Sequence, residues 1–142
     1  MPMNRSFIKL ASVTHVFWYT LTGGIVGARV SRAPVLLLTA TGRKSGRPHT
    51  RPLLYLQDGE NMVIIASNGG SDKHPEWWLN LRADPKAEVQ VGRDVRAVVA
   101  EKASGDERDR LWREVNELYH GYDGYQRSTD REIPVVVLRP ER

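Results

Sequence analysis

The fold is decided by a stretch that reads VLLLTAT-GRKSGRP-HTRPLLYLQ over residues 35–57. Its first seven residues are a short apolar run, which predicts a buried strand at residues 35–41. The basic segment bracketed by glycines at residues 42–48 predicts a turn, and a second strand follows at residues 49–57. Asp58-Gly59 is a hairpin signal that leads into a third strand, MVIIAS, at residues 62–67. Consecutive strands joined by tight turns are typical of an antiparallel sheet.

The remaining chain continues this pattern. A loop at residues 68–72 precedes a short helix that has Pro75 in its first turn and ends at Leu81. Residues 87–92 and 95–103 form an expected strand pair. A capping box at residues 104–107 opens a second helix. The apolar positions of that helix are Leu111, Trp112, Val115, Leu118 and Tyr119. A last strand covers residues 133–138, and Pro134 predicts that it starts at an edge or a bulge. About six strands and these helices predict an α+β fold with an antiparallel sheet curled into a barrel.

An amphipathic helix is expected over residues 4–21, and its apolar stripe consists of Phe7, Leu10, Ala11, Trp18 and Leu21. We divide the chain into this N-terminal segment, residues 1–24, and a barrel domain over residues 25–142. The helix is expected to act as a lid, to pack on the core, or to lie on a membrane surface. Its apolar run at residues 10–21 is too short for a span of about 20 residues, and no convincing cleavage site follows it. We therefore expect a cytoplasmic protein, with peripheral association at the inner face of the plasma membrane as an open alternative.

Composition limits the chemistry that this protein can perform. With 142 residues, 40% hydrophobic and 27% charged, the chain is expected to form one ordered domain. It contains no cysteine, which excludes disulfides, thiol catalysis and cysteine-ligated metal centres.

Charge is distributed unevenly along the chain. The first acidic residue is Asp58, and the remainder of the chain is net acidic. The basic residues that precede it are Arg5, Lys9, Arg29, Arg32, Arg43, Lys44, Arg47 and Arg51. A basic half indicates an anionic partner such as a phosphate-bearing cofactor, a nucleic acid or an anionic membrane, or simply a solvated basic face.

The turn at residues 42–48 is the first candidate site. Its glycines allow backbone N–H groups to approach an anion, while Arg43, Lys44 and Ser45 supply positive charge and a hydroxyl. The glycine spacing differs from that of a Walker loop, and no helix is expected after it. The alternative is an ordinary basic hairpin tip.

The second candidate site covers residues 65–81, where a strand runs into a Gly-Gly loop and then a helix start. Backbone N–H groups there suit carbonyl or anionic oxygens of a ligand. One of Trp77 and Trp78 is expected to pack against a flat ring of the ligand. The other is expected to join the core, because adjacent helical positions point about 100° apart. His74 has no neighbouring metal ligands in the sequence, so we expect it to play a structural or supporting role and expect no metal site.

The third candidate site is the segment in which Tyr119, Tyr122 and Tyr125 recur every three residues. A tyrosine can stack on a substrate and donate a proton, although packing under a loop is the alternative for at least one of them. The sequence contains no catalytic triad motif, no zinc-protease motif and no dinucleotide fingerprint. A binding apparatus without a protein nucleophile suits an enzyme whose cofactor carries the chemistry.

Three long stretches carry a resemblance to a known family: TATGRKSGRPHTRPLLYLQDGE, VIIASNGGSDKHPEWWLNLRADPKAEVQVG and YQRSTDREIPVVVLRP. With TGG at residues 22–24 and PVLLLT at residues 34–39, they cover nearly all of the chain from Thr22. The sequence resembles the F420-dependent nitroreductase family, the deazaflavin-dependent oxidoreductases of actinobacteria. The resemblance implies a split β-barrel of the flavin-reductase and pyridoxamine-phosphate-oxidase type, with an N-terminal helix and two further helices.

The resemblance also implies that the cofactor is coenzyme F420, whose phosphate and oligoglutamate tail are anionic and suit the basic half. The cofactor-binding residues that it implies are Arg43, Lys44, Ser45, His49, Thr50, Arg51, Pro52, Leu53, Leu54, Ile65, Ala66, Ser67, Asn68, Glu76, Trp77, Trp78, Leu79 and Asn80. The implied substrate-binding residues are Trp18, Leu54, Tyr119, Tyr122 and Tyr125. Some relatives carry an aromatic residue in place of Leu54 and a lysine in place of Asn68, so the substrate pocket is expected to differ more than the cofactor site.

The implied reaction is hydride transfer from reduced F420 to a small electron-poor acceptor, such as a quinone, a nitroaromatic or an activated enone. Tyr122 is the expected catalytic residue, donating a proton or a hydrogen bond to the acceptor. The alternatives are an FMN-dependent split-barrel reductase and a non-catalytic F420-binding protein. A nucleic-acid partner is not expected, because no RNA-binding signature is present and the aromatic residues lie mostly outside the basic stretch.

Overall fold

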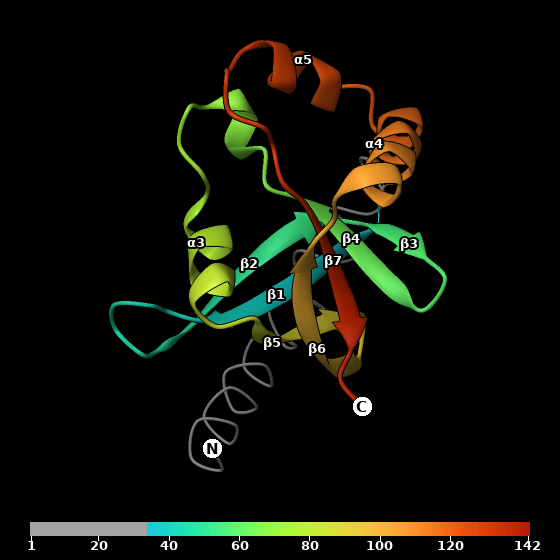
Figure 1. The fold of residues 1–142 in the computed structure, drawn as a ribbon. Coiled ribbons are helices and arrows are strands. Elements are labelled where there is room, and N and C mark those ends of the chain that lie inside the picture. Colours follow the sequence, from blue (N-terminus) through green and yellow to red (C-terminus); the bar gives the residue numbers. More distant parts are fainter. Residues whose placement is uncertain (1–33) are drawn as a thin grey trace.

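Seven strands form one sheet in the computed structural model, which describes residues 34–142. The strands are β1 (Val35–Thr41), β2 (Pro48–Leu54), β3 (Leu56–Asp58), β4 (Asn61–Ile65), β5 (Lys86–Val91), β6 (Asp94–Lys102) and β7 (Val135–Pro140). Their order across the sheet is β2-β1-β5-β6-β7-β4-β3, and every neighbouring pair is antiparallel (Figure 1). The antiparallel α+β prediction is thereby confirmed.

The sheet curls because its two edge strands are consecutive in the chain. β2 and β3 lie at opposite ends of the strand order, yet only Tyr55 separates them. One residue spans less than about 4 Å, so the two edges have to meet at this point. The Tyr55 N–H donates to the Pro34 carbonyl (3.2 Å), in register with the β1–β2 pairing, and the chain then passes directly into β3. The prediction of one strand over residues 49–57 is therefore wrong, and the break at Tyr55 gives the sheet its half-barrel shape.

Alternation along the strands divides the interior into two clusters. Met62 and Ile64 on β4 point into the barrel, where they join β1, β5, β7 and α3, the helix at Glu76–Ala83. Val63 and Ile65 point to the other face, where they pack with α4, the helix at Gly105–Leu118. Because neighbouring side chains of a strand point to opposite faces and both faces of β4 are covered, residues 62–65 are all buried and apolar.

The strand β7 lies inside the sheet, between β6 and β4. Our expectation that Pro134 starts an edge strand or a bulge is therefore wrong. Pro134 precedes the first ladder residue, where a missing N–H costs no hydrogen bond, and its carbonyl accepts from the Ala66 N–H (3.0 Å).

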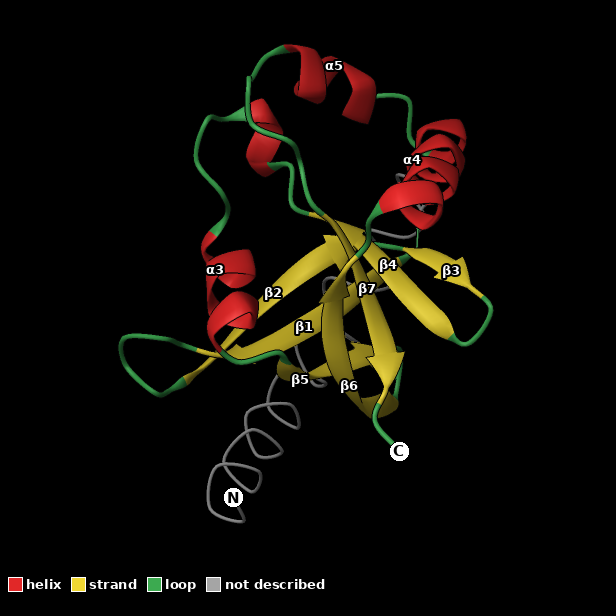
Figure 2. Cartoon of the chain, viewed as in Figure 1, coloured by secondary structure: helices red, strands yellow, loops and turns green. Residues whose placement is uncertain are grey.

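Three α-helices and one 3₁₀ turn complete the described residues, with α3 and α4 on different sides of the curled sheet (Figure 2). The additional helix, α5 (Tyr122–Arg127), was predicted as a turn at Asp123-Gly124, and the count of two further helices is corrected to three. Contacts remote from this turn signal stabilise it, since the Asp123 N–H donates to Asn116 Oδ1 (2.9 Å) and the Asp123 carboxylate accepts from Trp112 Nε1 (2.8 Å).

The expected N-terminal helix, residues 1–24, and Trp18 lie outside the described residues. Membrane association and location in the cell accordingly stay predictions. Within residues 34–142, no helix is long and apolar enough to cross a membrane.

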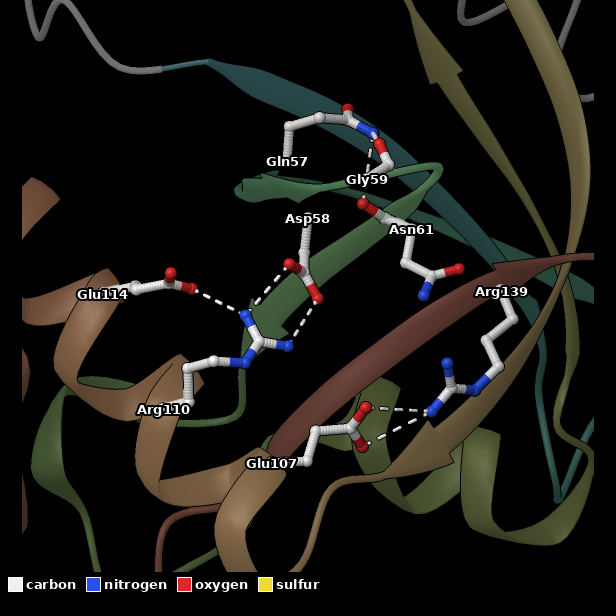
Figure 3. Close-up of polar contacts among 8 residues, drawn as sticks. All are labelled: Gln57, Asp58, Gly59, Asn61, Glu107, Arg110, Glu114 and Arg139. Atoms are coloured by element: carbon white, nitrogen blue, oxygen red, sulfur yellow. Dashed lines mark hydrogen bonds and ion pairs between the residues drawn. The ribbon is translucent and has the colours of Figure 1, made fainter.

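Ion pairs attach α4 to the sheet (Figure 3). Arg110 donates through both terminal nitrogens to the carboxylate of Asp58 at the end of β3, each at 3.1 Å. Glu107 accepts from Arg139 Nη2 on β7, at 3.3 and 3.4 Å. Ser104 is the N-cap residue but makes no side-chain cap hydrogen bond, and the Glu107 carboxylate pairs with Arg139, so the expected capping box is not formed.

Asp58→Asn is expected to destabilise the protein in a pH-dependent way. The hydrogen bond from Arg110 lowers the pKa of Asp58 below its ordinary value of about 4. Because the pKa of Asp58 is lower in the folded protein than in the unfolded chain, the ion pair stabilises the fold at pH values above the ordinary pKa. This stabilisation is lost as the pH falls through the folded-state pKa. The melting temperature of Asp58→Asn should therefore lie below that of the parent at pH 7, with the difference shrinking below pH 4. The control is Asp109→Asn, which changes an exposed carboxylate on α4, the helix that carries Arg110. A difference that stays unchanged down to pH 2 would contradict the account.

Candidate functional site

The larger of two adjoining cavities has a volume of about 560 Å³ and opens where β2, the end of β4 and the start of α3 meet. Leu53, Leu54 and Ile65 form an apolar part of its lining. The residues that line it are Arg51, Pro52, Leu53, Leu54, Ile65, Ser67, Asn68, Gly69, Lys73, His74, Pro75, Glu76, Trp77 and Tyr122. An apolar wall with a few polar groups suits a flat organic ring.

The smaller cavity, of about 310 Å³, lies over the turn between β1 and β2. It is lined by Ala40, Gly42, Arg43, Lys44, Ser45, His49, Arg51, Glu76, Trp77 and Asn80. Arg51, Glu76 and Trp77 line both cavities. The two cavities therefore form one groove, with a basic end over the turn and an apolar, ring-sized end beside β4.

The basic turn is held in shape by hydrogen bonds and by close packing. The Gly42 N–H donates to the Arg47 carbonyl (2.7 Å), and the Gly46 N–H donates to the Gly42 carbonyl (2.8 Å). A Cβ atom on Gly42 would come within 2.6 Å of the His49 ring, so a larger residue there would have to displace that ring. The His49 ring in turn contacts the Ser45 hydroxyl (3.2 Å), which fixes that hydroxyl at the groove.

Asn80 and Glu76 hold Arg43 in place from α3. Asn80 is buried, and its Oδ1 accepts from the Arg43 backbone N–H (3.1 Å) and from Arg43 Nη1 (2.9 Å). The same Nη1 donates to Glu76 (2.7 Å), and this hydrogen bond lowers the pKa of the Glu76 carboxyl. Glu76 is thus negatively charged, and its charge offsets the positive charge of Arg43. Lys44 and Arg51 form no ion pair within residues 34–142, so they are the cations that remain available to an anion.

The two adjacent tryptophans divide as predicted. Trp77 is half-buried and lines both cavities, whereas Trp78 is 5% exposed and belongs to the barrel core. Positions 100° apart on α3 cannot both face the groove. Trp78 is accordingly corrected from a cofactor-wall residue to a core residue.

Of the three tyrosines, only Tyr122 lines a cavity. Tyr119 donates its hydroxyl to the Tyr55 carbonyl (3.2 Å), and Tyr125 is 40% exposed. Tyr122 packs edge-on between them, at centroid distances of 6.1 and 6.0 Å. Burial raises the pKa of Tyr122, and it raises the pKa of Tyr119 to about 12. Tyr122 therefore keeps its proton at neutral pH and can donate a hydrogen bond into the cavity.

The structure brings most of the predicted cofactor residues together and leaves some outside. Those that line the groove are Arg43, Lys44, Ser45, His49, Arg51, Pro52, Leu53, Leu54, Ile65, Ser67, Asn68, Glu76, Trp77 and Asn80. Those that do not are Thr50, Ala66, Trp78 and Leu79. The Thr50 hydroxyl bonds to the Thr39 hydroxyl (2.7 Å), and Ala66 is fully buried.

The sequence did not indicate that residues 128–131 hold the loop beside the large cavity, residues 66–74. The Ser128 hydroxyl donates to the Gly70 carbonyl (2.9 Å), and the Thr129 hydroxyl donates to Asp72 (2.7 Å). Arg131 contacts the same loop. These pairs are 57 to 65 residues apart in sequence, so no local pattern reveals them. Within residues 34–142, no group of three or more His, Asp or Glu side chains could hold a metal ion.

Comparison with known proteins identifies the family of this chain. Residues 12–140 match the model of the family described as F420H(2)-dependent quinone reductase. The chain belongs to this family. An F420H(2)-dependent quinone reductase of Mycobacterium tuberculosis is 43% identical over 124 residues, which are 84% of this chain and 83% of the relative. Membership confirms the expected class of enzyme, an oxidoreductase that uses coenzyme F420 and a small-molecule electron acceptor.

Solved structures support the split-barrel fold of this F420H(2)-dependent quinone reductase family member. An F420-H2 dependent reductase superposes with a TM-score of 0.69 at 38% identity, covering 75% of this chain and 94% of its own. The haem storage protein HutZ of Vibrio cholerae superposes with a TM-score of 0.61 at 16% identity, covering 82% of this chain and 89% of its own. The second likeness concerns the fold alone.

Gly70→Ala is expected to lower stability by about 1–3 kcal/mol, because Gly70 has a φ of +83°. An added Cβ would also lie 2.2 Å from the Ser128 hydroxyl oxygen and 3.1 Å from the Tyr125 backbone. Gly69→Ala is the matched control, since Gly69 has a φ of +64° but no atom within 4 Å of its added Cβ. Urea unfolding should show the larger loss for Gly70→Ala. Equal losses would mean that the loop and α5 do not pack closely there.

Proposed function

We propose that this protein reduces quinones with F420H2 bound along the groove, its anionic end over Lys44 and Arg51 and its ring in the large cavity. The observation that carries this proposal is the continuity of a basic cavity with an apolar one through Arg51 and Trp77. The residues fit the cofactor, because a phosphate and carboxylates need unpaired cations, and a flat ring needs an apolar wall.

When bound, reduced F420 supplies a hydride, which carries two electrons and one proton. Conversion of a quinone to a hydroquinone takes two electrons and two protons, so negative charge develops on a quinone oxygen before the second proton arrives. The O–H of Tyr122 is placed to donate a hydrogen bond to that oxygen or to transfer the proton. Leu53, Leu54, Ile65 and Trp77 hold the reactants and keep water out of the cavity.

The cofactor assignment is tested by titrating the protein with oxidised F420, and separately with FMN, while following tryptophan fluorescence. Trp77 lines both cavities, so saturable quenching by F420 and none by FMN is expected. Arg51→Gln should lower F420 affinity about tenfold, equivalent to about 1.4 kcal/mol, and should make binding less sensitive to salt.

Arg47→Gln is the matched control for this titration, because Arg47 lies in the same turn but lines neither cavity. It should leave F420 affinity within twofold of the parent. Equal losses in the two variants would point to general attraction by the basic turn and would remove Arg51 from the proposed site. Binding of FMN in place of F420 would overturn the assignment of the cofactor.

Tyr122→Phe is expected to slow quinone reduction on the order of 10²-fold while leaving F420 affinity unchanged. The ring remains and its packing with Tyr119 and Tyr125 is kept, so the loss reports on the hydroxyl. Steady-state kinetics with a soluble naphthoquinone would measure it. Tyr125→Phe, which changes a hydroxyl outside the cavities, should retain the parent rate. Unaltered turnover of Tyr122→Phe would exclude this hydroxyl from the mechanism.

A further inference from the structure

Arg131 ties together the loop that borders the large cavity. It lies between α5 and β7, and its Nε donates to the Ser71 carbonyl (2.8 Å). Its Nη2 donates to the Ser67 carbonyl (2.8 Å), and its Nη1 donates to the Ala66 carbonyl (3.2 Å). One rigid guanidinium thus fixes three carbonyls over six residues of backbone, which a lysine with its single nitrogen could not do.

The same guanidinium contacts His74. Arg131 Nη1 lies 3.2 Å from His74 Nδ1. A guanidinium has only donors, so Nδ1 has to accept and cannot carry a proton. The ring proton of neutral His74 therefore resides on Nε2. The contact with Arg131 thus sets both the tautomer and the orientation of the ring. In functional histidines, the hydrogen bond of one ring nitrogen commonly decides the protonation of the other.

The surroundings of His74 favour this neutral form. Burial lowers its pKa, and the positive charges of Arg131, Arg82 on α3 and Lys102 on β6 lower it further. Protonation of Nδ1 would place an N–H against an N–H of Arg131 and would break the contact. His74 is hence neutral at pH 7, with a donor at Nε2.

His74 also lines the large cavity, together with Ser67, Asn68 and Tyr122. Nε2 has no hydrogen-bond partner among the residues that the structure describes. Tyr122 and His74 are thus two of the cavity-lining side chains that carry a neutral donor. Both the F420 ring and a quinone carry carbonyl oxygens that accept such a bond.

We propose that Arg131 is a positioning residue that locks His74 into the Nε2–H tautomer, and that this N–H donates to a carbonyl oxygen of the ligand in the large cavity. The tautomer is a property of the protein alone. The ligand contact rests on the proposed function. The carbonyl oxygen that accepts from His74 belongs either to the cofactor ring or to the quinone.

The tautomer is tested by NMR of the full chain labelled with ¹⁵N at histidine, in the absence of any ligand. Long-range ¹H–¹⁵N spectra at pH 7 should show a protonated Nε2 and an unprotonated Nδ1 for His74. On titration its midpoint should lie below the ordinary value of about 6.5. In Arg131→Gln the midpoint should rise and the tautomers should mix, whereas Arg127→Gln, which changes an exposed arginine of α5, should leave both unchanged. A proton on Nδ1, or a charged ring at pH 7, would overturn the positioning role.

The ligand contact is tested by comparing His74→Phe with His74→Gln. Phenylalanine removes the donor, whereas the glutamine amide keeps an N–H near the Nε2 position. If the acceptor is the cofactor ring, His74→Phe should weaken F420 binding about tenfold, measured by tryptophan fluorescence. If the acceptor is the quinone, F420 affinity should be kept and kcat/KM for a naphthoquinone should fall about tenfold. In both cases the loss in His74→Gln, expressed as the logarithm of the F420 affinity or of kcat/KM, should be at most half of the loss in His74→Phe.

His120→Ala, on an exposed histidine that lines neither cavity, is the control for both measurements. Parent values for both F420 affinity and kcat/KM in His74→Phe would overturn the ligand contact, even if the spectra show the expected tautomer. If the parent protein neither binds F420 nor reduces a quinone, the proposed function fails, but the ligand-free spectra still decide the role of Arg131.

Discussion

The single residue between β2 and β3 is the constraint on which the rest of the structure depends. Because Tyr55 alone joins the two edges of the sheet, the sheet has to close on itself. Tyr55 is held at this junction from three directions: its N–H bonds to Pro34, its carbonyl accepts from Tyr119, and its ring is buried in the barrel core. The closure brings β2, the start of α3 and the end of β4 around one space, and the groove is the result.

The basic end and the apolar end of the groove are formed by different elements of the fold. A glycine-rich turn supplies the cations of the basic end, and buried Asn80 fixes that turn to α3. The apolar end is made by side chains of β2 and β4 and by Trp77. Glu76 pairs with Arg43, so at the basic end of the groove the positive charge offered to an anion comes from Lys44 and Arg51. The charge count of the sequence alone would have assigned the cationic role equally to all of them.

Long-range contacts decide the chemistry at the apolar end. Tyr122 reaches the cavity because α5 forms and packs it between Tyr119 and Tyr125. The segment that follows, residues 128–131, returns to hold the loop at residues 66–74 through hydroxyl and guanidinium donors. A mobile loop could not present His74 in one tautomer, whereas one fixed at this many points can. In the proposed function, ligand binding and proton donation would both depend on the loop that this short segment holds in place.

The sequence by itself determined the strands other than the one that breaks at Tyr55, together with the antiparallel α+β class, the basic turn and the family. Apolar periodicity, turn residues and long matching stretches are local properties of a chain. It also predicted that one of two adjacent tryptophans joins the core, since adjacent helical positions point about 100° apart. Only the tertiary structure decided that the second strand breaks at Tyr55, that β7 is central, that α5 exists and that Glu107 pairs with Arg139. Each of these depends on partners remote in sequence, as does the contact between Arg131 and His74, 57 residues apart, and no local pattern encodes such a pairing.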